Sequence, residues 1–348
     1  MKLNRLYLLI VCSFLSLAVF GQDQHFTMFD HAPITLNPAN TGAYEGTFRV
    51  GGIFRDQSFA NGNVYTTPSF YIDAPILTVR KRDWISVGGV FISDQAGDLL
   101  NTQLQHIVGA YHLSLNKKQT SVLSLGVAWG TVTKRLDKNN NVLFPDGETT
   151  RIPDGGFSDE NMTSDWNTGL TFRSKMNKTT DIKIGFSLNH FIKFDSTSLN
   201  LVDQPRWKLP TRFTLHGEYD VQITKQWSIH PKFMFQRIAN HDEPVVQFHA
   251  GYRLLKREIR KDGRKGKLIK DDEAPVFKFG VGYRLADAAQ FIFGYEWKGL
   301  RAGLAYDLTL SGLNDFNNSN GAFELAASYI FKIYKKPTVD PVILCPKF

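Results

Sequence analysis

Two histidines, His216 and His230, are the residues best placed for chemistry, since each falls among charged side chains on the predicted polar face of a strand. A hydrolase would need such a base beside a nucleophile, and would lose lipid or peptide turnover when either histidine is removed. The sequence has no Gly-x-Ser-x-Gly turn, phosphate-binding glycine loop, His-Glu-x-x-His helix or paired-cysteine metal motif. We therefore predict that the protein is not an enzyme and that it has no catalytic, cofactor-binding or metal-binding residues.

Positive charge concentrates in one of the two sets of turns that join the predicted strands. A basic surface favours acidic partners and steers their approach. A single lysine there is better explained as a solvated side chain, so the prediction rests on the excess over the whole set. The residues predicted to bind a partner are Arg80, Lys81, Arg82, Lys256, Arg257, Arg260, Lys261, Arg264 and Lys265 in the turns, and Ile343, Leu344, Cys345 and Phe348 in the tail.

The first residues predict export. Lys2 and Arg5 precede an apolar run at residues 6–20, and Gly21 suits cleavage before Gln22. A short apolar run followed at once by polar residues is typical of a signal peptide rather than a membrane anchor. Residues 1–21 are therefore predicted to be a signal peptide. Of the two cysteines, Cys12 would leave with it, so no internal disulfide is expected.

Strict alternation of apolar and polar residues marks the strands that position these side chains. It is clear at residues 213–221, 227–236, 300–309 and 323–332. A soluble sandwich also alternates, but its strands usually have about five or six residues, whereas a tilted membrane strand needs about 9–11. The chain also has 27 Phe, 12 Tyr and 28 Gly, which suits strands with an aromatic lipid-facing side. We predict an all-β, antiparallel outer-membrane β-barrel.

The alternating segments number about fourteen, an even number, as bacterial single-chain barrels require, and this places both chain ends on the periplasmic side. The barrel is predicted to occupy residues 44–332. The strand candidates are 44–58, 64–77, 84–94, 102–115, 120–134, 165–174, 181–193, 209–221, 227–239, 245–255, 275–286, 289–297, 300–310 and 321–332.

Two end segments complete the predicted organisation. Residues 22–43 form a short N-terminal segment, rich in turn-forming residues, that is expected to fold under the barrel or into its periplasmic mouth. Residues 333–348 form a periplasmic tail that contains three prolines, which exclude it from a sheet interior. The tail is too apolar for a solvated disordered segment, so it is expected to dock either on its own barrel or on a partner.

The chain resembles the PorP/SprF family of outer-membrane proteins over essentially the whole predicted mature length. The matching stretches are QDQHF at 22–26, LNPANTG at 36–42, RDQ at 55–57, KLPTR at 208–212, GLAYD at 303–307 and CPKF at 345–348. The resemblance implies a role in type IX secretion and gliding motility in Bacteroidetes, with periplasmic motor components and a secreted surface adhesin as partners. It implies no catalytic residues.

Together these features predict a non-enzymatic component of the cell outer membrane that contacts lipid and no nucleic acid. It would be needed for secretion or surface anchoring of a partner adhesin, and it would dock periplasmic machinery. The alternative is an outer-membrane transport barrel for hydrophobic or small solutes. Steady open-channel conductance would favour that alternative.

Overall fold

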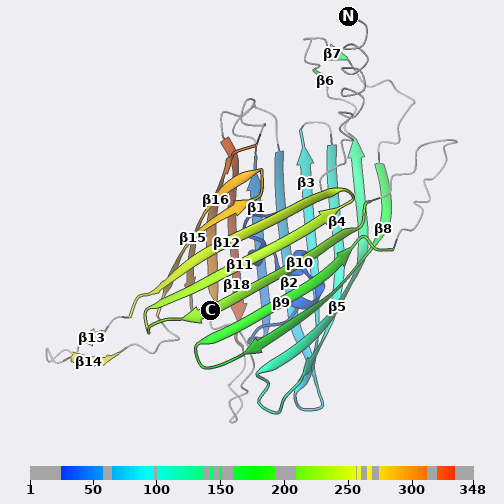
Figure 1. Ribbon diagram of the computed structural model, residues 1–348. Helices are drawn as coiled ribbons and strands as arrows, with labels where there is room; N and C mark the ends of the chain where they lie inside the picture. Colours follow the sequence, from blue (N-terminus) through cyan, green and yellow to red (C-terminus); the bar gives the residue numbers. More distant parts are fainter. Residues whose placement is uncertain are drawn as a thin grey trace, which may run out of the picture.

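A closed antiparallel barrel of fourteen strands forms the body of the protein (Figure 1). The computed structural model describes residues 25–57, 65–97, 100–136, 142–143, 149–150, 160–192, 209–255, 257–259, 265–268, 274–311 and 320–333. The barrel strands are β1 (Phe48–Asp56), β2 (Tyr65–Val79), β3 (Asp83–Ala96), β4 (Leu100–Ser114), β5 (Ser121–Leu136), β8 (Glu160–Lys175), β9 (Thr180–Asn189), β10 (Arg212–Gln222), β11 (Trp227–Ile238), β12 (His241–Arg253), β15 (Val276–Arg284), β16 (Ala288–Trp297), β17 (Leu300–Thr309) and β18 (Asn320–Phe331).

Neighbours in the chain pair in sequence around the barrel, and β1 pairs with β18 to close it. That seam runs from Phe48 opposite Phe331 to Asp56 opposite Phe323. The predicted fold class is therefore confirmed. Two connections predicted as loops also hold short strand pairs, namely β6 (Val142–Leu143) with β7 (Thr149–Thr150), and β13 (Arg257–Ile259) with β14 (Lys265–Leu268).

The alternation along each strand separates a lipid-facing side from a lumen-facing side. In β4, Ile107 is 68% exposed, whereas His106 and Val108 on either side are 7% and 1% exposed. Apolar side chains such as Phe248, Phe279 and Phe291 are likewise exposed on the outer face, as a membrane barrel requires. Within the described residues, no helix is both long and apolar enough to cross a membrane.

The barrel has two unlike ends. At the turn end, β1 begins, β18 ends and several connections are short, including the turn at residues 80–82 and the turn Lys298-Gly299. At the loop end the connections from β5 to β8 and from β9 to β10 are long, and at the turn end the connection from β12 to β15 is long as well. Most turn-end connections follow the predicted sorting of short turns and long loops, and the long connection after β12 is the exception to it.

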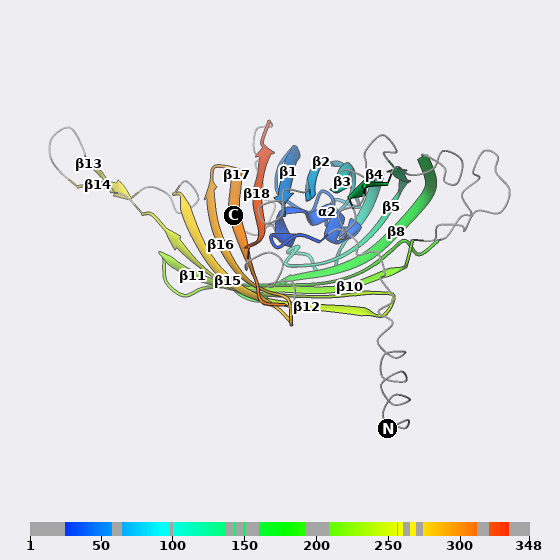
Figure 2. The ribbon, with the colours of Figure 1, turned by 90° about the horizontal axis from the view of Figure 1, so that it is seen from above.

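Residues 25–47, called here the lumenal segment, run through the inside of the barrel (Figure 2). The segment contains η1 (Phe29–His31), α2 (Pro33–Leu36) and η2 (Pro38–Asn40). Proline begins both α2 and η2, where its missing N–H costs no hydrogen bond. The sequence predicts residues 22–43 at the periplasmic mouth, but the described part extends from the turn end to the loop-end half of the lumen, because wall side chains bind it along its whole length.

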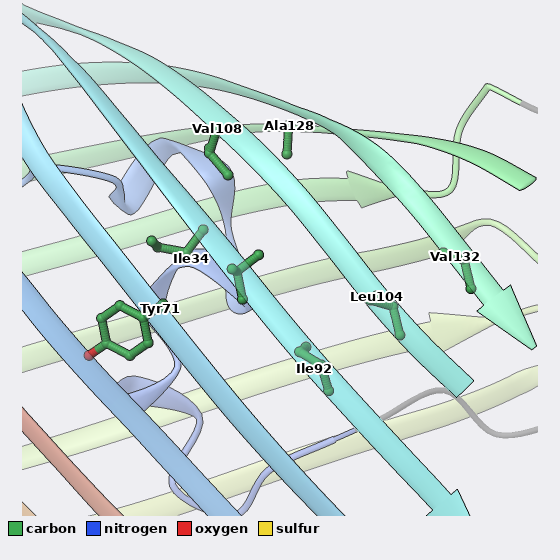
Figure 3. Packing of buried hydrophobic residues seen from close by; sticks show 8 residues of the cluster. Ile34, Tyr71, Ile92, Leu104, Val108, Ala128 and Val132 are labelled. Atoms are coloured by element: carbon green, nitrogen blue, oxygen red, sulfur yellow. The ribbon is translucent and has the colours of Figure 1, made fainter. Parts of the chain in front are cut away.

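Apolar side chains of the lumenal segment complete the buried core. Ile34 packs among wall residues that include Ile92, Val108 and Val132 (Figure 3). A second cluster contains Met28 of the segment and Ala326 of β18, and a third joins Phe29 and Leu36 to β11 and β12. Burial of such side chains stabilises by roughly 1.5–3 kcal/mol each, so the segment is an integral part of the fold.

Candidate functional site

The loop-end half of the lumen holds the segment through one carboxylate, Glu324 of β18. Its two oxygens accept hydrogen bonds from the backbone N–H groups of Thr27 and Met28, at 2.7 and 2.8 Å. Arg55 of β1 pairs with the same carboxylate at 2.5 Å. Glu324 is fully buried, so these bonds act in a low-dielectric site where charge-assisted bonds are strongest.

A second carboxylate, Asp307 of β17, extends this anchor. It accepts a hydrogen bond from Thr27 Oγ1 at 2.6 Å and lies 3.0 Å from an amino group of Arg284. Arg284 also pairs with Glu243 at 3.2 Å. This buried group of two arginines and three carboxylates ties the first described residues to strands β1, β12, β15, β17 and β18.

The middle of the lumen centres on Asp30 of the segment. Lys232 donates to this carboxylate at 2.5 Å, and Arg301 pairs with it as well. Burial alone would raise the pKa of Asp30, but Arg301 and Lys232 hold that pKa well below its usual value, so the carboxylate is ionised. Glu296 lies 3.2 Å from Arg301 and 2.8 Å from Lys278, and so continues the network along the wall.

Nearer the turn end, the wall binds the backbone of the segment. Asp73 accepts a hydrogen bond from the Gly42 N–H at 2.6 Å and holds Arg49 through both carboxylate oxygens. His112 Nε2 lies 2.9 Å from the Thr41 carbonyl oxygen. Arg173 donates to the Ala43 carbonyl at 2.5 Å and to Asn40 Oδ1 at 2.9 Å.

Glycines in the wall leave room for this close contact. A Cβ atom on Gly126 would lie 2.2 Å from the Pro38 carbonyl carbon, and one on Gly169 would lie 2.1 Å from Asn37 Oδ1. Real Cβ atoms do not approach backbone atoms so closely. The wall is therefore shaped around the segment as well as bonded to it.

Asn37 joins the segment to two wall strands. Its Nδ2 donates to the carbonyls of Leu170 and Phe186 at 3.0 and 3.1 Å, while its Oδ1 accepts the Ala39 N–H and caps η2. Asn177 caps a turn in the same way by accepting the Thr179 N–H, but it lies at an exposed site. The two asparagines make the same kind of local cap but differ in burial and in long-range bonding. Asn177 therefore serves as the control for Asn37.

We predict that Asn37→Ala lowers the free energy of unfolding by about 1–3 kcal/mol, because it removes the side-chain donor to the partly buried carbonyls of Leu170 and Phe186. Asn37→Asp keeps the cap but faces the same carbonyls with a charge, so its effect should be larger. Asn177→Ala should change stability much less. The temperature at which the folded gel mobility is lost measures all three, and equal shifts for Asn37→Ala and Asn177→Ala would contradict the prediction.

Ser228, His230 and Asp220 form the arrangement nearest to a catalytic site. Ser228 Oγ lies 2.9 Å from His230 Nε2, and His230 Nδ1 bonds to Asp220. The order of groups matches that in serine hydrolases. However, β10, β11 and β12 direct their N–H groups along the sheet to neighbouring strands, so these strands offer no N–H pair as an oxyanion hole. His216 is buried 3.2 Å from Asn37 Nδ2.

Comparison with known proteins shows the family to which this chain belongs. The sequence profile of a family described as "Type IX secretion system membrane protein PorP/SprF" matches residues 18–329. The chain belongs to the PorP/SprF family. It is therefore an outer-membrane component of the type IX secretion system, and it is not an enzyme, in agreement with the prediction. No curated protein sequence matches this PorP/SprF chain.

Solved structures show the same fold at low sequence identity. The toluene transporter TbuX of Ralstonia pickettii is 13% identical, with 86% of this chain and 93% of that chain covered and a TM-score of 0.50. The CymD monoaromatic hydrocarbon channel is 11% identical, with 90% and 96% covered and a TM-score of 0.52. At such identities the likeness extends to the barrel fold alone.

The partner-binding residues predicted for this PorP/SprF protein are described only in part. Arg80, Lys81 and Arg82 form an exposed turn between β2 and β3. Arg257 and Lys265 lie in the pair β13–β14, whose side chains are not described. The remaining predicted residues lie outside the described part of the chain: Lys256, Arg260, Lys261, Arg264, Ile343, Leu344, Cys345 and Phe348.

The residues that hold the lumenal segment were not predicted from the sequence. Their types gave one usable signal, since a charged residue such as Lys232 or Glu324 facing the lumen needs a partner. Alternation showed which residues face inward, but it did not show that Asp30 and Thr27 would meet them. Within the described residues, no cluster of potential metal ligands is present.

Proposed function

We propose that this PorP/SprF protein is a sealed outer-membrane anchor of the type IX secretion and gliding machinery. It is needed for secretion or surface attachment of a partner adhesin, and it docks periplasmic machinery at its turn end. The observation that carries the proposal is the lumenal segment, which runs through the inside of the barrel and is held by buried ion pairs. A barrel whose interior is occupied by its own chain is suited to binding rather than to passage.

The alternative is a transport barrel for hydrophobic or small solutes. TbuX and CymD carry the names of a toluene transporter and a monoaromatic hydrocarbon channel. An aromatic hydrocarbon passing through this lumen would have to displace Thr27 and Asp30 from charged wall residues, and exposing such charges to an apolar solute is costly. Single-channel recording in planar bilayers separates the two proposals, since the sealed anchor predicts no steady open-channel current.

Deletion of the gene tests the secretion role directly. The surface and secreted proteins of the deletion strain would be compared with those of the parent by mass spectrometry. We expect one large surface protein to be lost from the surface and to return when the gene is restored. An unchanged surface proteome would contradict the proposal.

The turn at Arg80 and Lys81 allows a docking test that leaves the barrel intact. Both residues have positive φ, 50° and 61°, as in a type I′ turn, for which Asn-Gly is preferred. We predict that Arg80→Asn/Lys81→Gly removes two charges while the stability of the barrel is kept or raised by about 1 kcal/mol. Co-purification of periplasmic type IX components from native membranes should then fall.

The control for this turn is Arg80→Lys/Lys81→Arg, which exchanges the two residues and keeps both charges. Co-purification should survive in this variant, because long-range attraction depends on charge more than on side-chain shape. Added salt should weaken capture by the parent and the control to a similar degree. If Arg80→Asn/Lys81→Gly co-purifies as much of the periplasmic components as the parent does, this turn is not part of the docking surface.

A further inference from the structure

A cavity of about 410 Å³ lies between the lumenal segment and the turn end of the barrel. Its inner wall includes Asp30, Pro33 and Ala43 of the segment, and its outer rim includes the turns at 176–179 and 223–226. We call this space the basic cavity. Nine lysine and arginine side chains line it, against four aspartates and glutamates.

Several of the cations are already neutralised. Lys183 lies 2.7 Å from Glu218, Lys278 lies 2.8 Å from Glu296, and Arg301 pairs with Asp30. These pairs belong to the network that holds the segment. Arg49 is likewise paired with Asp73, and Arg173 donates to the lumenal segment.

The unneutralised charge lies toward the rim. Lys175, Lys178, Lys225 and Arg253 line the basic cavity, and within the described residues none of the four has a carboxylate within ion-pair distance. The Nε atom of Arg253 is buried and has no hydrogen-bond partner among those residues. A buried N–H donor without an acceptor costs about 1–3 kcal/mol, so an acceptor that enters from outside is favoured there.

The chemistry of this lining selects an anion. Guanidinium and ammonium groups bind carboxylate oxygens through short charge-assisted bonds. Partly enclosed walls also focus the field of like charges and raise the local concentration of counter-ions. The volume also lies within the usual range for ligand pockets of about 300–1,000 Å³.

We propose that the basic cavity binds an acidic peptide segment presented to the turn end of the barrel. The inference rests on the proposed docking of periplasmic machinery, and it adds a site and a ligand class to that function. A peptide is favoured over a lipid headgroup because the cavity lies inside the barrel wall, whereas the lipid lies outside it. The acidic peptide would contact Lys178 and Lys225 at the rim and then Lys175 and Arg253 inside the cavity.

The test measures binding of fluorescein-labelled hexaglutamate to the purified full-length protein in zwitterionic nanodiscs at low ionic strength. Lys175→Gln/Lys225→Gln/Arg253→Gln should weaken binding by about ten-fold or more, the equivalent of at least one charge-assisted bond. Lys117→Gln/Lys118→Gln/Lys298→Gln removes the same charge from turn-end positions outside the cavity lining. This control should change binding by less than about two-fold.

Three outcomes would overturn the inference. Equal weakening by both triple variants would indicate a diffuse charge effect, and absence of hexaglutamate binding to the parent would remove the site. Competition by inorganic phosphate or anionic lipid as strong as competition by unlabelled hexaglutamate would assign the cavity to phosphate groups instead. Retained gel mobility shows that each variant is folded, and hexaglutamine should not bind.

The outcomes also separate this inference from the proposed function. If the gene deletion leaves the surface proteome unchanged while hexaglutamate binding is lost only in the cavity variant, the site stands and the secretion role fails. If the deletion removes the surface protein but both triple variants bind alike, the role stands and the site fails.

Discussion

Replacement of Glu324 by glutamine is expected to lower the free energy of unfolding by about 3 kcal/mol or more, because it removes one partner of a buried ion pair. Arg55 would lose its 2.5 Å contact with Glu324 and keep Asp307 at 3.4 Å and the Thr27 hydroxyl at 3.2 Å. The amide would also replace one of the two oxygens that accept the Thr27 and Met28 N–H groups. The loss is measured as the urea midpoint of tryptophan fluorescence and as the temperature at which the folded gel mobility disappears.

Asp242→Asn is the matched control for Glu324→Gln. Asp242 also pairs with an arginine, Arg237, through both oxygens, but the two side chains are 42% and 58% exposed. Exposed pairs contribute little, since water already solvates both charges. We expect no measurable shift in the midpoint. Similar shifts in the two variants would show that Glu324 does not act as a buried anchor.

Gly126→Val is expected to displace the lumenal segment from its position against the barrel wall. A Cβ atom at this position would lie 2.2 and 2.3 Å from the Pro38 carbonyl carbon and the Ala39 nitrogen. Both are backbone atoms, so the clash cannot be relieved by rotation of a flexible side chain. Overpacking of this kind costs about 1–3 kcal/mol, and partial release of the segment should appear as ion conductance in planar bilayers and as proteolysis within residues 25–47.

Gly109→Val supplies the comparison on the neighbouring strand. A Cβ atom on Gly109 would meet nothing within 4 Å, and Gly109 lies opposite Val127 on the exposed side of β4 and β5. This variant should remain closed and resistant to protease. If Gly126→Val is equally closed and resistant, the segment is not held by close packing at Gly126.

The barrel was predictable because the alternation of apolar and polar residues is visible within each short stretch of the sequence. In β10, Phe213 and Leu215 alternate with Arg212 and Thr214, and only a strand places such residues on opposite faces. Strand length and even number then separated a membrane barrel from a sandwich. The observed strands and the unlike connections at the two ends follow from the same reasoning.

The lumenal site was not predictable because its contacts are distant in the chain. Thr27 and Glu324 are separated by 297 residues, and no period relates them. Residues 25–47 consist of single turns and bends with no repeating pattern, so the sequence showed turn formers such as Asn37 and Pro38 without showing what they would pack against. The signal peptide at 1–21 and the docking of the tail at 333–348 stay predictions.

The position of the anchor at Glu324 has a consequence for biogenesis. The strand that carries Glu324 is also the strand that closes the ring against β1. A growing chain that has not yet delivered β18 therefore lacks both its seam and the carboxylate that secures Thr27 and Met28. Closure of the ring and the hydrogen bonds to Thr27 and Met28 therefore both depend on β18, the last strand of the barrel.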